Sequence, residues 1–149
     1  AFAQTQGAQH TINYRTENVA ERVLALTNGK GVDLVLDHVA GPDFTANLSM
    51  LRPWGTLVSF NSYAGSPTKD LFSELRGMVD LCVGIRVFSM HVFDHDAAAR
   101  RAIMNKVIAL LEAGAIDPAV GPRFALKDAA AAQAAVEGGA ALGKVVMLP

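Results

Sequence analysis

The chain has 149 residues, of which 51% are hydrophobic and 18% charged, and its formal net charge is −1. This length and composition are typical of one globular domain, and the small net charge gives no reason to expect nucleic acid or a membrane surface as partner. No apolar run approaches the ~20 residues of a membrane span, and the N-terminus lacks the pattern of a signal peptide. The single cysteine, Cys82, excludes an internal disulfide and a thiolate metal cluster. We therefore expect a reducing, cytoplasmic setting.

The N-terminal third predicts the end of one helix and then a complete second helix. Residues 1–6 can end a helix at Gly7, and residues 10–14 are a candidate extended segment. Thr16 is a plausible N-cap for the second helix, which ends at residues 28–29, Asn-Gly. The apolar face of that helix comprises Val19, Ala20, Val23, Leu24 and Leu26.

The next segment predicts two buried strands joined by a helix. Residues 32–39 contain three consecutive apolar residues, a pattern typical of a strand covered on both faces of a parallel sheet. A helix over 41–51 and a turn over 52–55 follow, because each contains a well-placed proline or glycine. Residues 56–60 predict the second strand. Its connection through a helix favours a parallel pairing with the first.

The remainder continues the alternation of helices and strands. In chain order we predict a loop at 61–70, a helix at 71–79, a strand at 81–89, a helix at 97–113, a helix from 127 to 139 and a strand at 144–148. Asp96 is the expected N-cap of the long helix at 97–113. Strands separated by such helices indicate an α/β fold built from βαβ units, and no linker is long enough to divide the chain into two domains.

Polar or small residues follow three of the expected extended segments. In an open parallel sheet, ligands bind beyond the carboxyl ends of the strands. That rule selects residues 13–15, 37–41 and 60–62. In the first group, the ring of Tyr14 beside the Arg15 guanidinium could flank an adenine and pair with a phosphate, although the same residues also suit an ordinary surface turn.

Other reactive side chains have simpler explanations. Asp37 and His38 are adjacent in an expected strand and point to opposite faces, so a shared proton relay is disfavoured and Asp37 is expected to cap the next turn. The two histidines and two aspartates within 91–96 could suggest a metal, but this stretch reads as the start of a helix. Cys82 lies in an apolar run and is expected to be a buried, inert thiol.

Four segments resemble a known superfamily. They read GAQHTINYRT (7–16), VDLVLDHVAG (32–41), LRPWGTLVSF (51–60) and GKVVMLP (143–149). They are similar to the cofactor domain of medium-chain dehydrogenases/reductases, in particular the zinc-free quinone oxidoreductase branch. The resemblance implies a partial Rossmann-type, doubly wound parallel sheet lacking its first β-α-β unit. Residues 1–149 would then be the C-terminal part of a dinucleotide-binding domain, without a substrate domain.

The resemblance also implies a cofactor and the residues that contact it. The cofactor is NADPH, with Tyr14, and Arg15 as a weaker candidate, at its 2′-phosphate and Val39 near its ribose and diphosphate. The nicotinamide half is expected near Phe60, Asn61 and Ser62, where the family usually has Gly-Asn after the phenylalanine. Trp54 likewise stands where the family has a turn glycine.

The implied reaction is hydride transfer from NADPH to a small molecule, either a quinone or an activated enone. No catalytic residue and no metal ligand is visible. A homodimer built on the strand near Leu81–Ser89 is implied as well. Because no G-x-G-x-x-G turn occurs in the sequence, we expect this chain alone to bind cofactor weakly or not at all and to be inactive.

Two other interpretations of the same pattern remain. Residues 32–60 also suit a fragment of an S-adenosylmethionine-dependent methyltransferase, although such folds usually close with an antiparallel hairpin. Alternatively, the chain is a non-catalytic nucleotide-fold module that mainly dimerises. Titration with NADPH, NAD and S-adenosylmethionine distinguishes the three.

Overall fold

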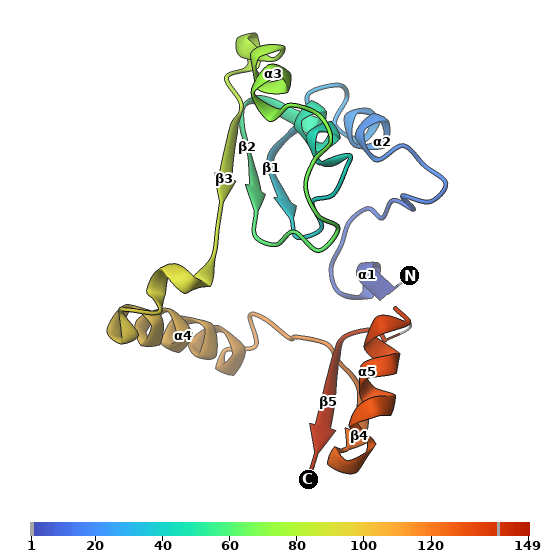
Figure 1. Cartoon of the computed structure of the whole chain (residues 1–149), viewed down its shortest axis with the longest axis vertical. Coiled ribbons are helices and arrows are strands. Elements are labelled where there is room, and N and C mark those ends of the chain that lie inside the picture. The colour runs from blue at the N-terminus through green and yellow to red at the C-terminus, as the bar shows by residue number, and fades with distance from the viewer. Residues whose placement is uncertain (1, 140) are drawn as a thin grey trace. The chain divides into compact units, whose positions relative to one another are not determined.

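The computed structural model describes residues 2–139 and 141–149, which form two compact units. One unit is Ile12–Asp94, and the other combines the N-terminal residues through Thr11 with His95–Pro149. We describe each unit by itself (Figure 1). That all 149 residues belong to one dinucleotide-binding domain stays a prediction. None of the helices in the described residues is long and apolar enough to cross a membrane.

A three-stranded parallel sheet organises the Ile12–Asp94 unit. Its strands are β1 (Val32–Asp37), β2 (Leu51–Ser59) and β3 (Gly84–Val87), in the order β1-β2-β3 (Figure 1). Leu34 of β1 is paired with Thr56, and Ser59 of β2 is paired with both Asp37 and Val87. The predicted parallel pairing of the first two strands is therefore confirmed. The predicted strand at 81–89 is present but shorter.

Short helices precede, connect and follow these strands. They are α2 (Val19–Leu26), the 3-10 helix η1 (Phe44–Met50), α3 (Leu71–Arg76) and the 3-10 turns η2 (Val79–Leu81) and η3 (Met90–Phe93). The N-cap of α2 is Asn18, whose side chain accepts from the Glu21 amide, so the assignment of the cap to Thr16 was wrong. Residues 10–14 form no strand in the described structure, because an extended segment becomes a strand only when another strand pairs with it.

The predicted turn at 52–55 lies inside β2 instead of before it. Val32 is paired with Leu51 but Leu34 with Thr56, so the turn inserts extra residues into the middle of the pairing. Trp54 adopts a left-handed φ of 66° there and is 80% exposed. A Cβ on Gly55 would lie 2.9 Å from the carbonyl oxygen of Arg52 and 3.0 Å from that of Val32, so a larger residue would force β1 and β2 to shift apart.

The core of this unit lies between the sheet and its short helices. It comprises Phe44, Leu48, Leu51 and Leu57, with Leu71, Leu75 and Met78 packed against it. The prediction that β1 is covered on both faces was wrong: Leu34 and Leu36 are 51% and 63% exposed. Successive side chains alternate across a strand, and these two lie on the face opposite the core contact of Val35.

The second unit contains a separate βαβ element. Strands β4 (Val120–Ala125) and β5 (Lys144–Leu148) pair in parallel, and α5 (Ala129–Glu137), preceded by the 3-10 turn η4 (Leu126–Asp128), packs against both. The short helix α1 (Phe2–Thr5) and the long helix α4 (Ala97–Glu112) complete it. Asp96 caps α4 as predicted, since its carboxylate accepts from the Ala99 amide at 2.9 Å. β4 was not predicted, because Gly121 and Pro122 interrupt it.

Every strand pair in the described residues is parallel, and helices separate the strands along the chain. This confirms the predicted α/β class. The strands fall into two sheets, of three and two strands, within the described residues.

Candidate functional site

The carboxyl ends of β1, β2 and β3 meet at one edge of the three-stranded sheet. Backbone hydrogen bonds continue the pairing beyond the strands: the Phe60 amide donates to the Asp37 carbonyl at 3.0 Å, and the Phe88 amide donates to the Ser59 carbonyl at 2.8 Å. The segments that leave this edge are also tied together, since the Ala64 amide donates to the Val39 carbonyl at 2.8 Å. The edge is therefore where parallel sheets of this kind bind ligands.

A pocket of about 360 Å³ opens at this edge beside β2 and β3. Phe60, Asn61 and Ser62 all line it, so the structure brings these three predicted residues together. The rest of its wall comprises Ala40, Phe44, Ser59, Gly65, Ser66, Pro67, Leu71, Ile85, Val87 and Phe88. The lining is mostly apolar, with Asn61 and Ser62 among its polar residues. Such a pocket suits a flat, weakly polar ring.

A second hollow of about 410 Å³ lies beside β1. Val39, the fourth predicted residue, lines it together with Asp37, His38, Asp43 and Asn47, among others. Ala40 lines both hollows, and the ring of His38 stacks on that of Phe60 with centroids 5.9 Å apart and planes at 27°. The turn after β1 therefore forms the wall between the two hollows.

Asp37 controls the shape of this turn. Its Oδ1 accepts hydrogen bonds from the amides of Val39 at 2.6 Å and Ala40 at 2.9 Å, and its Oδ2 accepts from the Asn47 side chain at 2.7 Å. Asp37 is 7% exposed, whereas the His38 ring is stacked and exposed. The prediction that Asp37 caps the turn is confirmed. Sequence reasoning missed Asn47, which no local signal distinguishes from the other polar residues of η1, Thr45 and Ser49.

The remaining two predicted residues lie on a separate turn, before α2. Tyr14 is 73% exposed, and the Arg15 amide donates to Asn13 Oδ1 at 3.1 Å. Neither residue lines the two hollows just described. The Arg15 guanidinium makes no hydrogen bond or ion pair with the part of the chain that the structure describes. It remains available to an anionic group.

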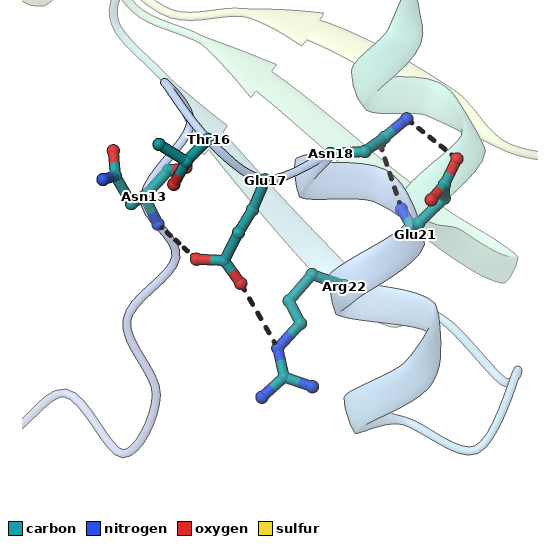
Figure 2. Close-up of polar contacts among 6 residues, drawn as sticks. All are labelled: Asn13, Thr16, Glu17, Asn18, Glu21 and Arg22. Atoms are coloured by element: carbon teal, nitrogen blue, oxygen red, sulfur yellow. Dashed lines mark hydrogen bonds and ion pairs between the residues drawn. The ribbon is translucent and has the colours of Figure 1, made fainter.

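Glu17 holds that turn in place (Figure 2). Its carboxylate accepts from the Asn13 amide at 2.9 Å and lies 3.7 Å from Nε of Arg22 in α2. The Asn13 carbonyl in turn accepts from the amides of Thr16 and Glu17. The turn that carries Tyr14 and Arg15 is thus anchored to the start of α2, whose first residue, Val19, lines the hollow beside β1.

The structure also shows the surroundings of two other reactive side chains, Cys82 and His91. Cys82 is exposed and ends η2 with a left-handed φ of 50°, so the prediction of a buried thiol was wrong: the chain turns there before β3 begins. His91 Nδ1 lies 2.8 Å from Asp94 Oδ2, an exposed pair within one turn of chain. No group of three or more potential metal ligands occurs in residues 2–139 and 141–149.

Comparison with known proteins gives a consistent set of relatives. The sequence profile of the family described as zinc-binding dehydrogenase matches residues 6–147. A quinone oxidoreductase of Pseudomonas aeruginosa is 33% identical over 148 residues, which are 99% of this chain and 45% of that protein. A 2-haloacrylate reductase of a Burkholderia species is 32% identical over 151 residues, covering 99% of this chain and 44% of the relative.

The fold has solved relatives as well. A mycobacterial protein whose structure was solved complexed with NADPH superposes with a TM-score of 0.84 at 28% identity, covering 99% of this chain and 44% of that one. The chain therefore spans less than half the length of these relatives. The superposition confirms the Rossmann-like arrangement implied by the sequence.

Proposed function

Because the chain belongs to the zinc-binding dehydrogenase family, we propose that it forms the nicotinamide-binding part of an NADPH-dependent oxidoreductase. The resemblance to the quinone oxidoreductase branch of the medium-chain dehydrogenases/reductases is confirmed. The parent reaction is hydride transfer to a quinone or an activated enone. The named relatives, a quinone oxidoreductase and a 2-haloacrylate reductase, support this acceptor class.

The pocket beside β2 and β3 is the observation that carries the proposal. Its apolar wall, which includes Phe60, Ile85 and Val87, offers a water-poor surface to the nicotinamide ring. Asn61 and Ser62 in the same wall can supply the hydrogen-bonding partners that a carboxamide needs. The hollow beside β1, with Val39 in its lining, is then left for the ribose.

A bound nicotinamide cofactor supplies the hydride, and the acceptor takes a proton to complete the two-electron reduction. The residues of this chain bind and orient: Phe60 gives the ring a face to pack on, and the turn through Val39 and Ala40 separates ring from ribose. Tyr14 and Arg15 are assigned to the 2′-phosphate. We assign no catalytic residue. The proposed setting is cytoplasmic, and the proposed assembly is a homodimer.

The test uses the 149-residue chain labelled with ¹⁵N and titrated with NADPH, NADH and S-adenosylmethionine. Since the sequence has no glycine-rich diphosphate turn, we expect NADPH to bind weakly, with a dissociation constant on the order of 1 mM, or about −4 kcal/mol. Amide resonances of Val39, Ala40 and Phe60 through Ser62 should shift.

Resonances of the second unit serve as an internal control, and those of β5 should not move. Stronger shifts with S-adenosylmethionine than with NADPH would favour the methyltransferase interpretation. Failure of every nucleotide to shift the edge of the sheet would favour the dimerisation module. The first result overturns the proposal, whereas the second is also expected of a cofactor domain that lacks its diphosphate turn.

A further inference from the structure

The turn between β1 and η1 is held at both ends by side-chain and backbone hydrogen bonds. Asp37 clamps its start through the amides of Val39 and Ala40. Asn47 reaches back from η1 to the other oxygen of the same carboxylate, ten residues away in sequence. Asp37 is buried and forms none of the ion pairs in the described residues, so its charge is compensated by these three donors.

The conformation held in this way is not one that the turn adopts freely. Ala40 has a φ of 53°, in the left-handed region that costs free energy for any residue with a Cβ. Strain of this kind persists only where the surroundings determine it. Here the surroundings are the two hydrogen bonds of Asp37 Oδ1 and the neighbouring loop, since the Gly41 amide donates to the Gly65 carbonyl at 3.0 Å.

Ala40, the strained residue, lies at the candidate ligand site. Ala40 lines both hollows, and Gly65, to which the turn is bonded, lines the one that contains Phe60. A change in the conformation of the turn after β1 therefore alters the walls of both hollows. Asp37 and Asn47 themselves line the hollow beside β1. Among the described residues, every buried side-chain nitrogen or oxygen atom has a hydrogen-bond partner.

We propose that Asp37 and Asn47 are a pair of positioning residues that set the NADPH affinity of this edge by fixing the turn through Val39 and Ala40. The inference rests on the proposed function. It assigns the effect to the hydrogen bond between the two side chains and not to the negative charge of Asp37. The charge and the hydrogen bond can be separated by exchanging the two side chains.

The variants are Asp37→Asn, Asn47→Asp and the double exchange. In Asp37→Asn, the side-chain oxygen still accepts from both amides, and the Asn47 amide can rotate to offer its oxygen to the new NH₂ group. In Asn47→Asp, two carboxylates oppose each other and the bond is lost. In the double variant, the new amide at position 37 donates to the new carboxylate at position 47, so the bond is restored with reversed direction.

We expect Asn47→Asp to weaken NADPH binding about tenfold, or about 1.4 kcal/mol. Asp37→Asn and the double variant should stay within about threefold of the unchanged chain. The Val39 and Ala40 amide resonances of the free protein should move in Asn47→Asp and return in the double variant. Asp80→Asn, which removes an exposed carboxylate that lines neither hollow, is the control and should change nothing.

A purely structural pair would lower the melting temperature of Asn47→Asp and leave the NADPH affinity of the folded molecules unchanged. That result overturns the inference, as does a folded double variant that still binds tenfold more weakly. If Asn47→Asp does not fold, Asn47→Ser removes the reaching amide without adding charge, and the same loss is expected. Absence of NADPH shifts in the unchanged chain overturns this inference together with the millimolar binding expected under the proposed function, whereas normal binding by both Asn47 variants overturns only this inference.

Discussion

Single polar side chains cap the first turns of three helices in this protein. Asn18, Asp70 and Asp96 each accept a hydrogen bond from an amide in the first turn of the helix that follows. Asp37 does the same for the turn after β1. An amide that would otherwise lack a partner is satisfied at each position, so the loss of one such oxygen destabilises the local structure.

The N-cap of α3 should make stability depend on pH. The Ser73 hydroxyl and then the Ser73 amide, at 2.6 and 2.8 Å, lower the pKa of Asp70 below its ordinary 3.8. A depressed pKa means that the cap stabilises the fold fully above pH 3.8 and that this contribution is lost as the pH falls through the lowered value. Asp70→Asn should therefore flatten the acid side of the stability profile measured by thermal unfolding.

Asp43 provides the comparison for that measurement. It precedes η1 in the same way, but its side chain makes no capping hydrogen bond. Asp43→Asn should leave the acid profile unchanged. Equal flattening in both variants would show that general charge repulsion, and not the cap, causes the pH dependence.

Tyr14 and Arg15 should distinguish NADPH from NADH. A 2′-phosphate gains charge-assisted hydrogen bonds from such groups, each worth about 1.5–3 kcal/mol. Tyr14→Ala or Arg15→Ala should weaken NADPH roughly ten- to a hundred-fold with little effect on NADH, as measured by the ratio of dissociation constants from NMR titration. The exposed Tyr63, next to the pocket residues, gives a control. Tyr63→Ala should leave the ratio unchanged, and an unchanged ratio in both test variants would refute the assignment.

At the scale of elements, irregular backbone is concentrated where strands must be adjusted to fit. The turn within β2 inserts residues between two regions of regular pairing, and Gly55 lets β1 and β2 approach there. β3 begins only after Cys82 has turned the chain in a left-handed conformation. These irregularities preserve a parallel register at the carboxyl edge, where the pockets lie.

Trp54→Gly should stabilise the protein. Trp54 has a φ of 66° and is 80% exposed, so it stores backbone strain and buries little apolar surface. Relief of a left-handed conformation is worth about 1–2 kcal/mol, and the greater freedom of glycine in the unfolded chain offsets part of it. We expect a net gain of about 0.5–1 kcal/mol in urea unfolding. Trp54→Ala keeps the Cβ and should give no gain; a gain as large as that of the glycine variant would refute the strain argument.

At the scale of the whole molecule, much apolar surface remains accessible. Leu34 and Leu36 on β1 are more than half exposed, and no residue of α4 is buried. The chain also spans less than half the length of its relatives. β3 lies at one edge of the three-stranded sheet, and its last residue, Val87, is 81% exposed. A strand edge that carries an exposed apolar residue favours association.

The proposed homodimer should therefore depend on β3. Sedimentation of the chain over a concentration series should show a reversible dimer, and Val87→Lys should shift it to monomer, because a charge at a strand edge opposes pairing. Val92→Lys changes an equally apolar residue, exposed in η3 and outside the strand, and should leave the dimer intact. A monomer at all concentrations, or equal effects of both lysines, would exclude pairing through β3.

The sequence by itself determined the α/β class, the parallel pairing of β1 with β2 and the capping roles of Asp37 and Asp96, because local propensity and hydrophobic pattern carry these features. It also predicted that Phe60, Asn61 and Ser62 follow a strand end, where one pocket collects them. Only the tertiary structure decided that β1 has an exposed face, that Cys82 is exposed and that Asn47 contacts Asp37. Each of these depends on which segments pack together across the chain, and a local pattern does not contain that information.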